Sequence, residues 1–146
     1  MDSVFIIGCS RRKKDTRRPT KAIQIYRGGG IPELYQAVLP YPSLLDRIFI
    51  LSAKHGLLSA HDEILPYEQK LSFEMALEMR AAVSNQIDAK IIHSLYPKVI
   101  YLLIEPNYLV MASVLFSEKY NGRIIWEPDV RKKKSILISN FIASID

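Results

Sequence analysis

The sequence is poor in cysteine and lacks long apolar runs, and each absence excludes a class of protein. Its one thiol, Cys9, excludes an intrachain disulfide and a zinc site built from several thiolates, and it suits a reducing compartment. No apolar run approaches the roughly 20 residues that span a bilayer, and the opening residues, Met1-Asp2-Ser3, do not resemble a cleavable leader. We therefore expect a cytoplasmic protein without a membrane segment.

What is present suffices for one globular domain. Hydrophobic residues make up 49% of the 146 residues, enough to build a core, and no linker, repeat or low-complexity tract divides the chain. We therefore expect a single domain over residues 1–146.

Positive charge is in excess and is clustered. Lysine and arginine outnumber aspartate and glutamate by 20 to 15, with a net charge of +5. Residues 11–21 hold seven basic side chains against one acidic one, and residues 131–134 add four basic side chains in a row. Clustered positive charge attracts phosphates, so a nucleotide or a nucleic acid is the expected partner. The alternative is that both clusters are merely solvated surface.

The order of elements predicts the fold class. Four apolar runs rich in β-branched residues, at 4–7, 48–51, 99–104 and 123–126, are each followed by a segment with helical features. This alternation is typical of a parallel sheet covered on both faces. We therefore predict an α/β fold, specifically a three-layer α/β/α sandwich with a mainly parallel four-stranded sheet.

The longest predicted helix has its apolar side chains four residues apart, at Met75, Met79, Val83, Ile87 and Ile91. Ser72 is a suitable N-cap for it, and Pro97 follows its end. Shorter helices are expected from Pro32, from Pro106 and after Asp129. The methionines at this spacing are interpreted as core. The connection from Ser10 to Ile31 is long enough to suggest a functional loop.

Polar residues follow each predicted strand, and in open α/β sheets ligands bind at the edge where the strands end. The ends of the third and fourth strands contribute residues 105–107 and 127–129 to this edge. The candidate catalytic residues are His55, Glu63 and Lys54. The candidate ligand-binding residues are Cys9, Ser10, Lys13, Lys14, Tyr26, Arg27, Ser52, Gly56 and Tyr67. No cofactor or metal is required by this set.

Each candidate has a chemical reason and a structural alternative. The imidazole of His55 transfers protons near neutral pH, and Lys54 is suited to bind a phosphate. Glu63 is suited to stabilise an electron-poor sugar carbon, as cleavage of an N-glycosidic bond demands. Glu105 and Glu127 are alternative carboxylates that the sequence does not rank. Each of these groups has a bland interpretation as well, in a turn, at a helix start or at an exposed strand end.

The end of the first strand offers two different chemistries. Cys9 would be a nucleophile if the basic run lowered the pKa of its thiol, and is otherwise a small buried hydrophobe. The backbone N–H groups of residues 8–10 would instead form an anion-binding nest. Tyr26 and Arg27 are suited to hold a base or a phosphate, although packing of the tyrosine is equally consistent.

The first half of the chain carries four motifs: Gly8-Cys9-Ser10 followed by Lys13-Lys14, Ile25-Tyr26, the run from Ile50 to Leu58, and Ile64-Leu65-Pro66-Tyr67. With these motifs it resembles a family of small uncharacterised domains of bacteria, archaea and phages. That family is distantly similar to the YaaA-like peroxide-stress proteins and to the accessory domain of archaeosine synthases. The second similarity implies a uracil-DNA-glycosylase-like fold and a link to modified nucleobases, although the water-activating motif of the glycosylases is missing here.

Three functions remain open at this stage. The first is an enzyme acting on a nucleotide, a nucleobase or a nucleic acid, at an N-glycosidic bond or in base modification. The second is a non-catalytic DNA- or RNA-binding module with a role in stress or phage defence, whose affinity comes from the basic clusters. The third, a redox sensor through Cys9, has no resolving cysteine in the chain.

Overall fold

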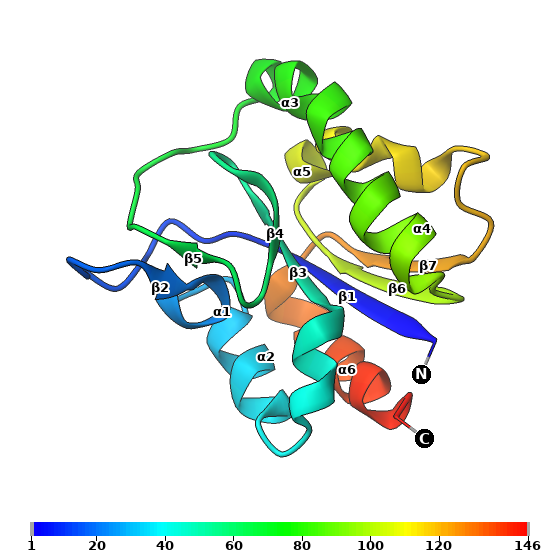
Figure 1. The fold of residues 1–146 in the computed structure, drawn as a ribbon, viewed down its shortest axis with the longest axis horizontal. Helices are drawn as coiled ribbons and strands as arrows, with labels where there is room; N and C mark the ends of the chain where they lie inside the picture. Colours follow the sequence, from blue (N-terminus) through cyan, green and yellow to red (C-terminus); the bar gives the residue numbers. More distant parts are fainter. Residues whose placement is uncertain (1, 146) are drawn as a thin grey trace.

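The computed structural model describes residues 2–145 and has a five-stranded sheet with the order β4-β3-β1-β6-β7 (Figure 1). The strands are β1 (Ser3–Gly8), β3 (Ile48–Ser52), β4 (Gly56–Ser59), β6 (Val99–Leu103) and β7 (Arg123–Glu127). β1 pairs in parallel with β3 and β6, and β7 pairs in parallel with β6. The four predicted strands are confirmed. The sheet has one strand more than predicted, because β4 adds to β3 in the antiparallel direction.

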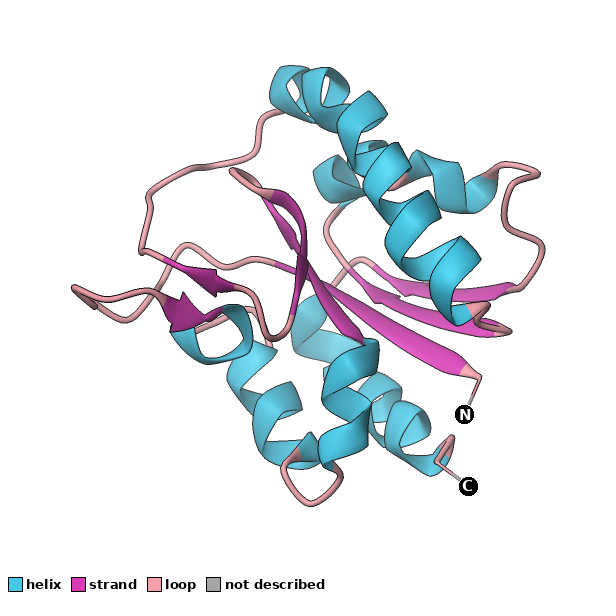
Figure 2. Cartoon of the chain, viewed as in Figure 1, coloured by secondary structure: helices cyan, strands magenta, loops and turns pink. Residues whose placement is uncertain are grey.

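The connecting segments are mostly helical (Figure 2). The α-helices are α1 (Ala22–Ile25), α2 (Ile31–Val38), α3 (Phe73–Ile87), α4 (His93–Leu95), α5 (Pro106–Met111) and α6 (Val130–Ala143). Two short 3₁₀ segments, η1 (Pro42–Arg47) and η3 (Ser113–Phe116), and one π-helical turn, η2 (Asp88–Ile92), complete the set. A small antiparallel pair joins β2 (Thr20–Lys21) to β5 (Glu63–Ile64).

The long predicted helix begins where expected and departs from regularity near its end. The hydroxyl of Ser72 accepts a hydrogen bond from the backbone N–H of Met75, so it caps α3 as predicted. The helix then passes through the π turn η2 and ends at Tyr96, whose φ of 48° is left-handed. Met75 and Met79 pack against the core, which confirms their interpretation as core residues.

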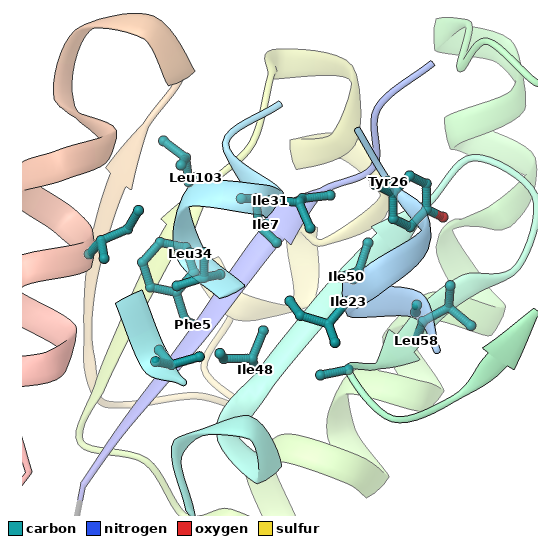
Figure 3. Packing of buried hydrophobic residues seen from close by; sticks show 14 of the residues in the cluster. Phe5, Ile7, Ile23, Tyr26, Ile31, Leu34, Ile48, Ile50, Leu58 and Leu103 are labelled. Atoms are coloured by element: carbon teal, nitrogen blue, oxygen red, sulfur yellow. The ribbon is translucent and has the colours of Figure 1, made fainter. Parts of the chain in front are cut away.

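Alternate side chains of the strands enter two separate core clusters. Phe5 and Ile7 of β1 belong to a cluster that includes residues of α1, α2 and α6, and part of it is seen in Figure 3. Val4 and Ile6 point the other way, into a cluster that includes residues of α3 and α5. Both faces of the sheet are therefore buried, which explains why its strands are continuous apolar runs.

The strand order places a switch point between β1 and β6. The connection from β1 to β3 contains α1 and α2, and it places β3 on one side of β1. The connection that leads on to β6 contains α3, and it places β6 on the other side of β1. The two connections leave β1 in opposite directions and cover opposite faces. In open α/β sheets a crevice forms outside the carboxyl ends of the strands at such a point. The end of β1 and the end of β6 are thus the expected place for a ligand.

The connection from Ser10 to Ile31 is not a structureless loop. It contains β2 and α1, and the α1 side chains of Ala22, Ile23 and Ile25 are buried.

Among residues 2–145, no helix has both the length and the apolar character needed to cross a membrane.

Candidate functional site

A cavity of about 920 Å³ lies at the carboxyl ends of β1 and β6, at the switch point of the sheet. Five segments line it: 8–12 after β1, 28–29, 69–71, 103–108 from β6 into α5, and 128–131 after β7. In α/β proteins, ligands usually bind in a large cavity with polar groups at this place in the sheet. Of the predicted site residues, Cys9 and Ser10 line it.

Cys9 and Tyr108 form one wall of this cavity. The Sγ atom of Cys9 lies 3.0 Å from the Oη atom of Tyr108 and accepts a longer hydrogen bond, 3.4 Å, from the backbone N–H of Ala53. Burial, and next the nearby thiol, raise the pKa of Tyr108 well above its usual value. The phenol therefore keeps its proton and, as the stronger donor of the two, donates to the sulfur.

The loop after β1 contacts the glycine segment that follows α1, and residues of both line the cavity. The hydroxyl of Ser10 accepts from the backbone N–H of Gly28 at 3.2 Å and donates to the carbonyl of Arg12 at 2.9 Å. Gly29 has a φ of 70°, and a Cβ atom there would lie 3.3 Å from the Cβ of Ser10. Glycine at this position thus permits both the left-handed backbone and the close approach of the two segments.

The charged side chains around the cavity differ in how far they are engaged. The exposed residues Arg11, Arg12 and Lys70 line it beside Arg131. A carboxylate oxygen of Asp129 accepts from the backbone N–H of Arg131 at 2.9 Å, and this bond is the main reason that the pKa of Asp129 lies below its usual value. Asp129 therefore serves first as the N-cap of α6.

The three alternative carboxylates occupy different environments. Glu105 lines the cavity, is exposed, and makes no capping hydrogen bond at the start of α5. Glu127 accepts from the backbone N–H of Asp129 at 2.9 Å. Glu63 is exposed on β5, where it pairs with Lys21 of β2, and it does not line the cavity. The geometry thus favours Glu105 for a role toward a bound ligand.

A second group of predicted residues gathers around Tyr67, next to the cavity. In this Tyr67 cluster, the Oη of Tyr67 lies 2.7 Å from the Oη of Tyr26 and 2.7 Å from the Oγ of Ser52. Ser52 also accepts from the backbone N–H groups of Lys54 and His55, at 3.1 and 2.9 Å. Its one hydroxyl proton is therefore left to donate to Tyr67. Burial raises the pKa of both tyrosines, so their hydroxyls stay protonated.

Lys13 connects the Tyr67 cluster to the cavity loop. Its ammonium donates to the carbonyls of Ser10 and Arg11 at 3.0 and 3.3 Å. The same nitrogen lies 4.2 Å from the ring centre of Tyr67 and 5.5 Å from that of Tyr26. Burial lowers the pKa of Lys13. Because it is held by backbone oxygens and aromatic faces, this ammonium positions the loop and does not line the cavity.

His55 and Lys54 lie exposed at the rim of the Tyr67 cluster. The imidazole of His55 packs edge-on against Tyr67, with ring centres 5.3 Å apart. Burial, and then the charge of Lys54, lower the pKa of His55 below its usual value, so the ring is neutral at pH 7. The Nζ of Lys54 lies 5.8 Å from the centre of the Tyr67 ring. Neither residue lines the cavity.

Gly56 is required by the fold at this place. Its φ is 73°, and a Cβ atom would lie 2.5 Å from the Oε1 of Gln86, the atom that accepts from the backbone N–H of Leu57. The remaining predicted residues are Lys14, on the loop after β1, and Arg27, after α1; both are exposed, and neither lines the cavity.

Several cavity residues were not among the predicted site residues. Glu105, Asn107 and Asp129 were assigned to the ligand-binding edge because they follow predicted strands, and Glu105 was one of three unranked carboxylates. Arg131 belongs to the basic run 131–134, which the sequence associates with phosphates or with a solvated helix start. Gln69 and Tyr108 gave no signal, because a glutamine in a loop and a tyrosine in a helix are common structural features. In the part of the chain that the structure describes, no group of three or more His, Cys, Asp or Glu side chains is placed to hold a metal ion.

Comparison with known proteins gave one family match. The model of a family of unknown function matches residues 4–124, which include the loops after β1 and β6 and the whole Tyr67 cluster. No curated protein and no solved structure gave a significant match.

Proposed function

The chain belongs to that family, DUF6884, and we propose that it binds a nucleotide, or the end of a nucleic-acid strand, in the cavity at the carboxyl ends of β1 and β6. The observation that carries this proposal is the position of the cavity at the switch point, with arginines from the loop after β1 and from the first turn of α6 on its walls. The proposal takes the fold to be a three-layer α/β/α sandwich, supported by the core clusters on the two faces of the sheet.

The phosphate would bind where the basic side chains and the glycine loop meet. Arg11 and Arg12 from the loop after β1 and Arg131 from the first turn of α6 line the same cavity. Guanidinium groups form bidentate hydrogen bonds with phosphate, and the lack of side chains at Gly28 and Gly29 allows close approach of an anion to the backbone. This arrangement requires no metal ion.

The base and the sugar would lie against the lining residues that carry no charge. Gln69, Leu71, Asn107 and Tyr108 are among them. Carboxamide groups supply both donors and acceptors for the edge of a base, and Leu71 and the Tyr108 ring offer apolar surface. A volume of about 920 Å³ is within the range of small-molecule sites, which is about 300–1,000 Å³.

The reaction we propose is hydrolysis or exchange at the N-glycosidic bond, or modification of the base. In hydrolysis the bond from the sugar C1′ to the base nitrogen breaks, the base leaves with the electron pair and takes up a proton, and water oxygen bonds to C1′. Glu105 is placed to stabilise the positive charge at C1′ or to accept the proton of the water. Glu63, which lies outside the cavity, is not needed for this role.

His55 and Lys54 have a separate place in the proposal. They lie beyond the cavity, at the rim of the Tyr67 cluster, so they would contact a substrate longer than a single nucleotide. A neutral imidazole and an ammonium at this rim suit a base and a phosphate of an adjoining nucleotide.

A non-catalytic nucleic-acid-binding function is the second candidate. It is favoured by the exposure of Arg11, Arg12, Lys14, Arg17 and Arg18 on the loop after β1. Affinity from such a loop would fall steeply with salt and would not depend on Glu105.

Calorimetric titration with nucleoside monophosphates, nucleosides and short oligonucleotides separates the two candidates. We expect saturable binding of a monophosphate, weakened at least about tenfold in Arg131→Ala, since hydrogen bonds to a charged group contribute about 1.5–3 kcal/mol. Arg80→Ala, an exposed arginine on α3, is the matched control. Binding of oligonucleotides alone, lost with salt and unchanged in Arg131→Ala, would support the second candidate instead.

A test of the reaction uses the ligand found by calorimetry. Release of free base from the bound nucleotide is followed by chromatography for the wild type and for Glu105→Gln, with Glu63→Gln as the control. We expect product from the wild type and from Glu63→Gln, and loss of product in Glu105→Gln with binding retained. Equal turnover in all three would remove Glu105 from the reaction.

A further inference from the structure

β7 is an edge strand whose outer side lacks a strand partner within residues 2–145. Its residues are only partly buried, unlike those of the other edge strand, β4, in which Gly56, Leu57 and Leu58 are buried. Trp126 keeps 38% of its surface exposed. A proline or lysine within the strand would discourage pairing with another strand, and β7 has neither between its terminal charges.

The backbone of β7 offers two sets of free hydrogen-bonding groups on this side. Arg123 is in register with Val99 of β6, and its N–H donates to the carbonyl of Lys98 at 2.8 Å. In a parallel ladder alternate residues bond to the same neighbour, so Arg123, Ile125 and Glu127 direct their backbone groups to β6. The N–H and C=O groups of Ile124 and Trp126 therefore point away from the sheet.

The sequence of β7 is Arg-Ile-Ile-Trp-Glu. When two copies of this strand lie antiparallel, the basic end of each faces the acidic end of the other, and apolar residues face each other between them. We propose that β7 is a self-association surface, through which two copies of this chain pair antiparallel about Ile125. In this register Ile124 lies opposite the partner's Trp126, and the outward backbone groups of both residues form hydrogen bonds. Arg123 lies opposite the partner's Glu127, on the same face of the joined sheet, and symmetry provides this charge pair twice.

The other registers that satisfy the outward groups are less complementary. Pairing Ile124 with its own copy, or Trp126 with its own copy, leaves Arg123 and Glu127 without an oppositely charged residue of β7 across from them. One oxygen of Glu127 accepts from the backbone N–H of Asp129, and the other forms a long ion pair with Lys133 at 3.9 Å, so the partner's Arg123 would share this carboxylate with Lys133. Two five-stranded sheets would thus join into one continuous sheet, with one cavity per copy.

Sedimentation equilibrium of the full chain, from low micromolar to high micromolar concentration, measures the association directly. We expect a monomer–dimer equilibrium. Arg123→Glu places like charges opposite each other twice and should weaken the dimer by about tenfold or more. The exchange Arg123→Glu with Glu127→Arg restores opposite charges and should recover most of the association. Arg80→Glu, the same change on exposed α3, should have no effect.

Ile124→Pro tests the backbone bonds. It removes an outward N–H that the β6 ladder does not use, and edge strands tolerate proline in this orientation. We expect a folded chain by circular dichroism that no longer dimerises. If that variant does not fold, the charge variants decide the question. A wild type that stays monomeric, or a dimer that Arg123→Glu leaves unchanged, would overturn the proposal.

Discussion

The thiol of Cys9 lies 3.0 Å from the phenol of Tyr108, and this contact joins the end of β1 to α5 across the switch point of the sheet. Both residues line the cavity. A ligand that fills the cavity must therefore lie against them, and the only thiol of the chain becomes a reporter of occupancy.

Nucleotide binding should protect Cys9 from alkylation. Iodoacetamide reacts with the free thiol, and a bound nucleotide would block its approach through the cavity. We expect the labelling rate, measured by intact mass, to fall as a nucleoside monophosphate saturates the site. The Arg131→Ala variant should need a higher nucleotide concentration for the same protection. A labelling rate that saturating nucleotide leaves unchanged would show that the ligand binds elsewhere.

Loss of the Tyr67 hydroxyl should destabilise the fold. Tyr67→Phe leaves the buried hydroxyls of Ser52 and Tyr26 without the partner that each has at 2.7 Å. An unsatisfied buried polar group costs about 1–3 kcal/mol, so the free energy of unfolding in urea should fall by about this amount. Tyr41→Phe, on a side chain that is 42% exposed, is the control and should be neutral. Equal stability of the two variants would contradict the hydrogen-bond network.

Two glycines near the site should differ sharply in their tolerance of alanine. Gly56→Ala meets both a left-handed φ of 73° and a Gln86 oxygen at 2.5 Å, whereas Gly28→Ala meets only the Ser10 side chain at 3.7 Å, an ordinary contact. We expect Gly56→Ala to lower the free energy of unfolding by about 1–3 kcal/mol. Gly28→Ala should change it by less than about 0.5 kcal/mol. A reversed order in urea denaturation would contradict the geometry of the turn after β3.

His55 should titrate below the usual pH for histidine. Its folded pKa is lowered, first by burial and then by Lys54, so the unfolded chain binds a proton more readily. The contribution of His55 to stability is therefore full above about pH 6.5, the unfolded pKa, and is lost as the pH falls through the folded pKa. In an NMR titration of the imidazole protons, with His55→Gln for assignment, we expect a midpoint for His55 below the usual pKa of histidine.

The variant Lys54→Ala tests whether the charge of Lys54 lowers the pKa of His55. Removing the neighbouring positive charge should move the His55 midpoint upward, and Lys132→Ala on α6 should leave it in place. A midpoint above the usual histidine value in the wild type would contradict the environment described for the ring.

The sheet was largely predictable because its strands are buried on both faces. Burial on both sides requires continuous apolar runs, as in residues 4–7 and 48–51, and these are visible without knowledge of the partners. β4 was missed because Gly56 to Ser59 forms a strand only through the turn at Gly56 and the antiparallel pairing with β3. The π turn at Asp88–Ile92 was hidden in the same way within a regular apolar spacing.

The site was predictable only in part. Its position depends on the order of the strands in the sheet, and the sequence of each strand does not reveal which strands become neighbours. Lys54 and His55 follow β3, and their residue types alone favoured a site at the end of that strand. The order β3-β1-β6, however, places the switch point between β1 and β6. The cavity therefore lies over Cys9 and Ser10, whereas Tyr26, Ser52 and Tyr67 bond to one another beside it. Lys13 holds the loop to these tyrosines, and its role toward a ligand stays a prediction.

The most direct test of the central claim is a map of backbone amide shifts during titration with a nucleoside monophosphate. We predict that the shifts concentrate in residues 8–12, 28–29, 69–71, 103–108 and 128–131, the segments that line the cavity. They should saturate together with one dissociation constant. Shifts confined to the basic residues 14–18, or an absence of shifts at saturating nucleotide, would contradict the claim that the switch-point cavity is the binding site.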